Sequence, residues 1–265
     1  MVNRGCDREF IQYKIEGLKS AKDYLREFGE LYYLYEGMSI TELPQVCAEI
    51  NKLNKTSKKP GSLPLPLSAA TRRNKIRYLC AACNFAYKKF GFGNHTPSER
   101  VSVPTVKNAR HNAPSRSDML TIARKMCRND ARRALICAFY SGMRKGEVLR
   151  ATVKNGSFIL TDTKNGKPRV VPAHPKLKDY LKYFPLQMDA QAVSGYFRRA
   201  RKAVNLDHYT FNDYRHGAAS QMINNGISLN TVENVLGHLS PVSTQRYAHL
   251  SISTLRDAVN SIGKK

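Results

Sequence analysis

Five residues in the C-terminal half of the chain could together cleave and rejoin a phosphodiester bond. Tyr247 offers a hydroxyl nucleophile, and His238 lies nine residues before it in LGHLSPVSTQRYAHL. Arg144 follows a Ser-Gly pair in SGMRKGEVL, Lys164 lies in TDTKNGKPR, and Arg215 lies in FNDYRHG. A tyrosine can form a covalent phosphoryl intermediate, and two planar guanidinium groups can bracket the non-bridging oxygens of a phosphate. A lysine can protonate the leaving oxygen, and a histidine can hydrogen-bond the phosphate or assist proton transfer.

Each of these residues has an ordinary structural interpretation when it is taken alone. Tyr247 is one of 14 tyrosines, most of which must pack in cores or lie on the surface. Lys167 is close enough to Lys164 in sequence to take its role. His208 and His216 lack the spacing of a metal site. Only the combination of residue types favours phosphodiester chemistry.

The net charge indicates a polyanionic partner. The 265 residues include 44 Lys and Arg against 20 Asp and Glu, a formal net charge of +24. Lys and Arg neutralise nucleic-acid phosphates with release of counterions, so we expect a nucleic acid as the partner. The alternative is a basic protein without a specific partner.

The positive charge is unevenly distributed. No acidic residue occurs between Glu49 and Glu99, whereas a solvated surface normally mixes both signs. We therefore expect this stretch to contact DNA, the alternative being a solvated helix face. The residues predicted to contact DNA are Arg72, Arg73, Lys75, Arg77, Lys88 and Lys89.

The six cysteines favour packing over metal binding. Cys80 and Cys83 form a CAAC stretch, but no second CxxC or HxxxH follows, so the match to a zinc site is weak. The absence of a disulfide framework favours a reducing cytoplasm. The sequence has no apolar signal region and no segment long enough to span a membrane, so no membrane partner is expected.

The first part of the chain has helical periodicity throughout. Apolar residues recur at intervals of three and four over 17–35, and helices are also expected over 39–53 and 69–91, the last capped by Ser68. The polar stretch 94–117 has the composition of an interdomain linker.

The second part of the chain combines helices with one small sheet. Two helices are expected within 115–142, and further helices over 188–204, 211–224, 228–236 and 252–262. Two Asn-Gly pairs, at 155–156 and 165–166, separate runs rich in β-branched residues. Such pairs favour type I′ hairpins, which here predict a three-stranded antiparallel meander.

The expected fold is therefore mainly α, of the α+β class, with two domains. Residues 1–112 are interpreted as a helical DNA-binding domain with its linker. Residues 113–265 are interpreted as a mixed helical domain that carries the small sheet and all five candidate catalytic residues.

The five residues resemble the catalytic set of the tyrosine recombinase family, which includes phage integrases. The chain carries a TGxRxxEL-like box with Arg144, a hairpin lysine, a box that ends in Arg215, and an LGH element nine residues before Tyr247. This resemblance covers 113–265, and LSAATRRNKIRYLCAACNFAYKKFG resembles the core-site DNA-binding domain that precedes the catalytic domain in this family.

The resemblance implies a site-specific recombinase or integrase of a phage or mobile element. Tyr247 would attack the scissile phosphate, form a 3′-phosphotyrosyl link and free a 5′ hydroxyl, with no metal or ATP as cofactor. The family works as a homo-tetramer on two DNA sites, and accessory DNA-bending factors are possible partners. The C-terminal helix expected over 252–262 could dock on its own domain or on a neighbouring subunit. An extra N-terminal arm-binding domain is expected to be absent or reduced, since the core-binding pattern begins near residue 17.

One position departs from the family pattern. Asn212, which the resemblance makes a sixth candidate catalytic residue, stands where the HxxR box usually has His or Lys. An amide cannot carry a proton at neutral pH, so we expect slower, but not abolished, cleavage. His216 lies four residues from Asn212 and could compensate if the segment is helical.

Two other functions remain open from the sequence. A type IB topoisomerase-like enzyme would share the tyrosine chemistry but relax supercoils without a specific site. A DNA-binding regulator descended from a recombinase would have lost catalysis, for which Asn212 leaves an opening.

Overall fold

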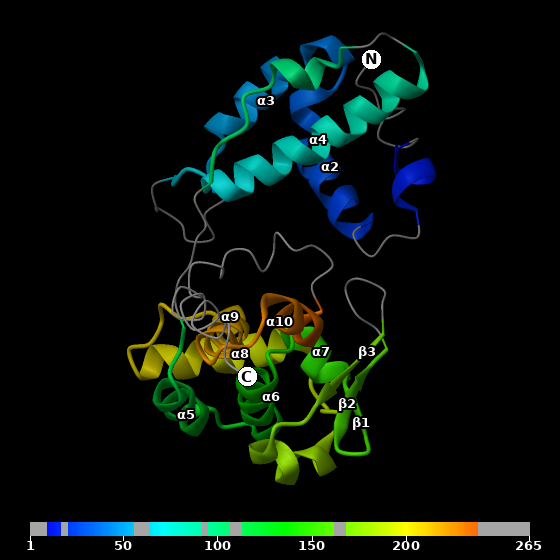
Figure 1. The fold of residues 1–265 in the computed structure, drawn as a ribbon. Coiled ribbons are helices and arrows are strands. Elements are labelled where there is room, and N and C mark those ends of the chain that lie inside the picture. Colours follow the sequence, from blue (N-terminus) through cyan, green and yellow to red (C-terminus); the bar gives the residue numbers. More distant parts are fainter. Residues whose placement is uncertain are drawn as a thin grey trace, which may run out of the picture. The chain divides into compact units, whose positions relative to one another are not determined.

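The structure is a computed structural model that describes residues 10–16, 21–55, 64–91, 95–106, 113–161 and 168–237. The chain divides into two compact units, Met1–Asn108 and Ala109–Lys265 (Figure 1). They are called the first and the second unit below, and each has its own buried core. No helix in the described part of the chain is both long and apolar enough to cross a bilayer.

The described part of the first unit is entirely helical apart from one isolated bridge. Its elements are the π-helix η1 (Ile11–Ile15), α2 (Ala21–Tyr35), the 3-10 helix η2 (Ile40–Glu42), α3 (Leu43–Lys52), α4 (Ala69–Lys89) and the 3-10 helix η3 (Pro97–Arg100). The hydroxyl of Ser68 accepts a hydrogen bond from the Thr71 amide at 3.1 Å, as expected of an N-cap. Gly91, with φ +67°, follows the end of α4. Cys47 and Cys83 are buried in the core between the helices.

Two features of the first unit differ from the sequence expectations. The single helix expected over 39–53 is divided into η2 and α3, with Pro44 at the start of α3. A proline has no N–H to donate and is tolerated in the first helical turn, so it marks a new helix start. The short helices η1 and η3 were not expected, because a single turn leaves little periodicity in a sequence.

The second unit contains six α-helices, a 3-10 helix and three strands in the described part. These are α5 (Arg116–Lys125), α6 (Asn129–Ser141), α7 (Lys145–Arg150), β1 (Thr152–Lys154), β2 (Ser157–Leu160), β3 (Arg169–Pro172), η4 (Pro175–Tyr183), α8 (Ala190–Ala203), α9 (Phe211–Asn224) and α10 (Leu229–Leu236). The expected helices over 188–204, 211–224 and 228–236 are confirmed within two residues, while the one over 252–262 lies outside the described residues.

Helix α6 forms the centre of the second unit. Its apolar second half, residues 134–139, is buried on all sides, and the helix packs against α5, α7, α8, α9 and η4. The ring of Tyr214 on α9 packs edge-on against Phe139 of α6 and against Phe197 and Phe211. The position of α9, which carries Arg215, is therefore set by the core.

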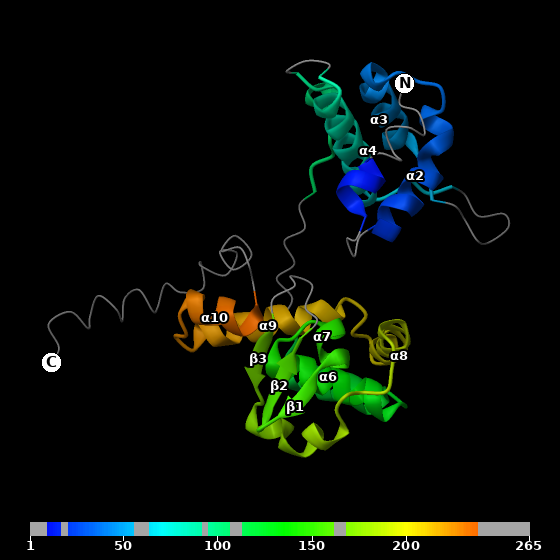
Figure 2. The ribbon, with the colours of Figure 1, turned by 90° about the vertical axis from the view of Figure 1, so that its right-hand side faces the viewer.

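The expected three-stranded antiparallel sheet is confirmed, in the order β1-β2-β3 (Figure 2). The first turn has positive φ at both Asn155 (49°) and Gly156 (69°), as a type I′ hairpin requires. The second Asn-Gly pair lies outside the described residues. Arg169 begins β3 and pairs with Leu160, the last residue of β2. It therefore lies at the end of the sheet that is next to residues 162–167 in sequence.

A candidate active site around Glu147

The Ser-Gly turn that precedes Arg144 places this arginine at the start of α7. Gly142 ends α6 in the left-handed conformation, with φ +64°. A Cβ at this position would lie 2.8 Å from Cδ2 of Leu236, so only glycine fits between α6 and α10. Arg144 then caps α7, and its backbone N–H donates to Oε2 of Glu147 at 2.8 Å. Its side-chain Nη1 donates to Oε1 of Glu147 at 2.9 Å.

Arg215 reaches the same place from α9. Its Nη1 donates to the carbonyl of Gly142 at 2.9 Å, and its Nη2 donates to the carbonyl of Leu236 at 2.7 Å. Nη1 also lies 4.0 Å from Oε2 of Glu147. The side chain is only 6% exposed, so Arg215 joins the ends of α6 and α10 as well as contributing charge.

A third arginine completes the cluster and was not predicted from the sequence. Arg169 donates from Nη1 to Oε1 of Glu147 and from Nη2 to Oε2, both at 3.0 Å. This bidentate geometry is the strongest form of arginine–carboxylate pairing. A signal was present in the sequence, because Arg169 shares a strand face with Val171, which is buried. A charged residue on the inward face of a strand requires a buried partner.

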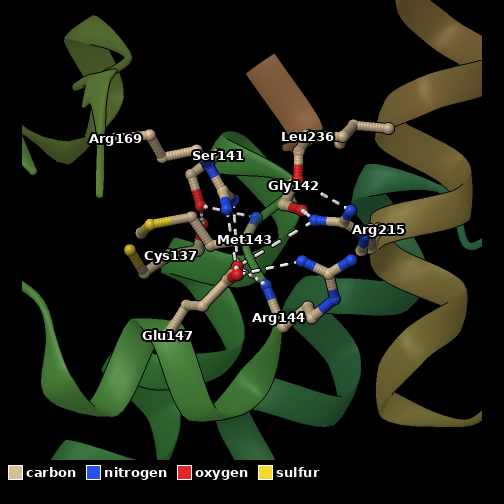
Figure 3. Close-up of polar contacts among 9 residues, drawn as sticks. All are labelled: Cys137, Ser141, Gly142, Met143, Arg144, Glu147, Arg169, Arg215 and Leu236. Carbon is tan, nitrogen blue, oxygen red and sulfur yellow. Dashed lines mark hydrogen bonds and ion pairs between the residues drawn. The ribbon is translucent and has the colours of Figure 1, made fainter. Parts of the chain in front are cut away.

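The cluster keeps an excess of positive charge (Figure 3). Three guanidinium groups surround the single carboxylate of Glu147, which is 2% exposed. Burial would raise the pKa of Glu147, but hydrogen bonds from Arg169 and from the Arg144 backbone, with the charges of both arginines, lower its pKa overall. The carboxylate therefore stays ionised and offsets one of the three positive charges.

The three arginine side chains differ in their exposure to solvent. The Arg144 side chain is 27% exposed, against 13% for Arg169 and 6% for Arg215. Arg144 is thus the arginine of this cluster that a solvent-borne anion reaches most easily. A preorganised, partly buried positive site of this kind can stabilise charge that develops on a phosphate.

The other predicted catalytic residues have different outcomes. Asn212 is exposed in the first turn of α9, three residues before Arg215. Lys164, His238 and Tyr247 lie outside the described residues. The chain nevertheless enters the LGH element at the cluster, because the carbonyl of Leu236 accepts from Arg215.

The predicted DNA-contacting residues on α4 fall into two groups. Arg77, Lys88 and Lys89 are exposed, whereas Arg72 and Arg73 are half-buried. Nη1 of Arg72 donates to the carbonyl of Asn51 at 2.7 Å, which fixes its guanidinium near α3.

Lys75 has to be removed from the DNA-contacting set. It is 8% exposed, and its Nζ donates to Glu27 at 2.7 Å and to Glu30 at 2.8 Å. Both glutamates belong to α2, outside the acid-free stretch that suggested a DNA-facing surface. The prediction failed because acidic partners of a helix come from its neighbours in space as well as in sequence.

Comparison with known proteins finds similarity to DNA recombinases and integrases. Residues 184–253 match the model of the phage integrase family. The shufflon-specific DNA recombinase of Escherichia coli is 27% identical over 201 residues, which cover 70% of this chain and 52% of that protein. The chain spans about half the length of the curated relatives it matches.

Solved structures share the fold. The Tn1549 transposon integrase in complex with circular intermediate DNA superposes with a TM-score of 0.70 at 15% identity, over 98% of this chain and 99% of that one. A lambda integrase tetramer bound to a Holliday junction gives a TM-score of 0.66 at 16% identity, over 90% of this chain and 77% of that one. The family resemblance found in the sequence is thus confirmed: residues 184–253 match the phage integrase family, and the chain is similar to curated tyrosine recombinases.

Proposed function

We propose that this protein is a site-specific DNA recombinase that cuts and rejoins strands through a covalent bond to Tyr247. The observation that carries the proposal is the convergence of Arg144 and Arg215 on the buried carboxylate of Glu147. The two arginines come from separate sequence boxes, and the cluster they form retains a positive excess suited to a phosphate.

The proposed reaction has two transesterification steps. The Tyr247 hydroxyl loses its proton to water or a neighbouring group, its oxygen attacks the scissile phosphorus, and the bond from phosphorus to the 5′ oxygen breaks. Lys164 donates a proton to that leaving oxygen, while Arg144 and Arg215 bind the non-bridging oxygens. The 5′ hydroxyl of a partner strand then attacks the phosphotyrosyl bond and releases Tyr247. The ester preserves the energy of the original bond, so the scheme requires no ATP.

The arginines supply the charge stabilisation that a metal ion would supply in a metal-dependent nuclease. His238 is assigned to the same phosphate, as a hydrogen-bond donor or in proton transfer.

We assign DNA binding to both parts of the chain. Residues 1–112 are proposed as the core-type DNA-binding domain, with Arg77, Lys88 and Lys89 towards phosphates. Residues 113–265 are proposed as the catalytic domain. The net charge of +24 and a structural neighbour solved with circular intermediate DNA support this assignment, with double-stranded DNA as the partner.

A homo-tetramer on two DNA sites is the proposed active assembly, by analogy with the lambda integrase tetramer on a Holliday junction. We propose that the protein recombines the DNA of a mobile element in the cytoplasm of a bacterial host. Accessory DNA-bending proteins are proposed partners by family resemblance alone.

A nicked duplex tests the proposal. The Tyr247→Phe variant first selects a binding sequence from a pool of randomised duplexes. A nick placed just 3′ of candidate scissile phosphates then lets the cleaved fragment diffuse away, so covalent protein–DNA adducts accumulate. Wild-type protein should form the adduct and Tyr247→Phe should not.

Two other results would point elsewhere. No adduct with the wild-type protein on its selected site would contradict both enzymatic functions and leave a DNA-binding regulator. Efficient relaxation of a supercoiled plasmid that lacks the selected site would favour the type IB topoisomerase.

A further inference from the structure

We propose that Arg169 is a positioning residue for strand cleavage, which acts by holding Glu147 so that Arg144 can face the scissile phosphate. This inference rests on the proposed function and assigns a role to a residue outside the five-residue catalytic set. The role is indirect, since both terminal nitrogens of Arg169 already donate to Glu147.

The geometry of the pair explains why an arginine is needed. Each Glu147 oxygen receives one Arg169 nitrogen at 3.0 Å, which fixes the plane of the carboxylate. The same two oxygens then accept the backbone N–H and the Nη1 of Arg144. The orientation of Arg144 is therefore determined through Glu147 by Arg169.

Removal of Arg169 would change the charge balance of the cluster. The Glu147 carboxylate is buried, and a buried charge that loses its main partner is drawn to the remaining ones. The remaining positive partners among the described residues are Arg144 and Arg215. Their charge would then be neutralised by Glu147 and would stabilise a phosphate less. Arg169 thus offsets the charge of Glu147, which leaves more of the positive charge of Arg144 and Arg215 to stabilise a phosphate.

Arg169 also connects the cluster to two neighbouring elements. It begins β3 opposite Leu160, at the sheet end that leads into the segment with Lys164. A Cβ on Gly237, which follows α10, would lie 2.7 Å from Cζ of Arg169. The Arg169 guanidinium thus bonds Glu147 of α7 and lies close to Gly237 of the LGH element, while the Arg169 backbone begins the strand that follows the segment with Lys164.

A set of variants tests the inference on the selected nicked duplex. Single-turnover adduct formation and duplex affinity are measured for Arg169→Ala, Arg169→Lys, Glu147→Gln and the double variant Arg169→Ala/Glu147→Gln. Lys154→Ala is the matched control, because Lys154 is an exposed basic residue at the opposite end of the same sheet. It removes one positive charge without touching Glu147.

The expected result separates rate from binding. Arg169→Ala should slow adduct formation by about 10- to 100-fold, a loss typical of residues that orient an active-site group, while the dissociation constant changes by less than about 3-fold. Arg169→Lys, which keeps the charge but not the fork, should fall between wild type and Arg169→Ala. The double variant should be no slower than the slower single variant, because both changes break one coupled unit.

Contrary results are equally clear. Equal rates for Arg169→Ala and Lys154→Ala, or fully additive losses in the double variant, would overturn the inference while the proposed function stands. If Arg169→Ala does not fold, a wild-type rate for the folded Arg169→Lys has the same effect. Only the absence of adduct from the wild-type protein contradicts the proposed function as well.

Discussion

Glu147 is the residue that allows three arginines to share one small volume. Like charges repel strongly in a buried setting, and a carboxylate among them lowers that repulsion. Its four hydrogen bonds, two from Arg169 and two from Arg144, satisfy both oxygens. The residue is therefore expected to stabilise the fold and to prepare the site at the same time.

The ionised Glu147 should make the second unit sensitive to acid. Its folded-state pKa is lowered, so its stabilisation is complete above the unfolded pKa of about 4.3 and is lost as the pH falls through the folded value. The unfolding free energy of wild type should therefore fall more steeply than that of Glu147→Gln between about pH 5 and about pH 3. Urea denaturation of both proteins measures this difference. Parallel curves would show that Glu147 does not stabilise the fold through its charge.

Asn212 offers a gain-of-function experiment. The residue is exposed at the start of α9, so a histidine can be accommodated there without disturbing the core. Since positioned proton transfer contributes about 100-fold or more to such reactions, Asn212→His should speed adduct formation, by at least about 10-fold. Asn212→Gln, which enlarges the amide but adds no titratable group, is the control. An unchanged rate for Asn212→His would mean that this position does not limit proton transfer.

At the scale of elements, the site is made by helix ends. The C-terminal ends of α6 and α10 present the Gly142 and Leu236 carbonyls to Arg215, and Arg144 is the N-cap of α7. Carbonyls at helix C-termini carry partial negative charge and lack intrahelical partners. They therefore hold a guanidinium well.

The effect of the close contact between Gly237 and the Arg169 side chain can be measured separately from the effect of the positive φ at Gly237. Gly237 and Gly156 have similar φ values, +66° and +69°, but only Gly237 is crowded, whereas a Cβ at Gly156 would meet nothing within 4 Å. Gly156→Ala should lower the free energy of unfolding by about 1 kcal/mol, from left-handed strain alone. Gly237→Ala should lower it by about 1–3 kcal/mol more, because its Cβ displaces Arg169.

Urea unfolding and adduct formation measure both glycine variants. Only Gly237→Ala should also slow adduct formation. Equal behaviour of the two variants would mean that Arg169 moves aside without consequence.

The sequence predicted elements better than contacts. Helices and the three-stranded sheet follow from apolar periodicity and Asn-Gly turns, which are local properties. The role of Arg169 depends on Glu147, which lies 22 residues away, and the pairing of Lys75 depends on glutamates 45 and 48 residues away. Strand alternation indicates that Arg169 needs a buried partner, but no local pattern identifies which residue that is. The Arg169 pair was therefore missed, and Lys75 was assigned to DNA. Arg144 and Arg215 were found because the family resemblance supplied the long-range information.

At the scale of the whole molecule, the net charge of +24 should make DNA binding strongly salt-dependent. Each phosphate contact contributes close to one unit to the slope of log affinity against log salt concentration. Arg77 is exposed on α4, so Arg77→Ala should weaken binding to all sequences and reduce the slope by about 1.

Lys75 provides the contrast, since it is buried and paired with Glu27 and Glu30. Lys75→Met should lower the melting temperature and leave the slope unchanged. Fluorescence anisotropy over a range of salt concentrations, with thermal unfolding of each variant, measures these effects. A reduced slope for Lys75→Met would restore this lysine as a phosphate contact.

The arginine cluster around Glu147 also affects the stage of folding at which the protein could break DNA. Its members come from α7, β3 and α9, and the contact between Arg215 and Gly142 spans 73 residues of sequence. Such distant partners meet only late in folding, after the intervening chain has become ordered. A nascent or partly unfolded chain would still be basic enough to hold DNA, but it would lack the arginine arrangement needed to break a strand. If the protein has the proposed function, only molecules that have finished folding should nick DNA.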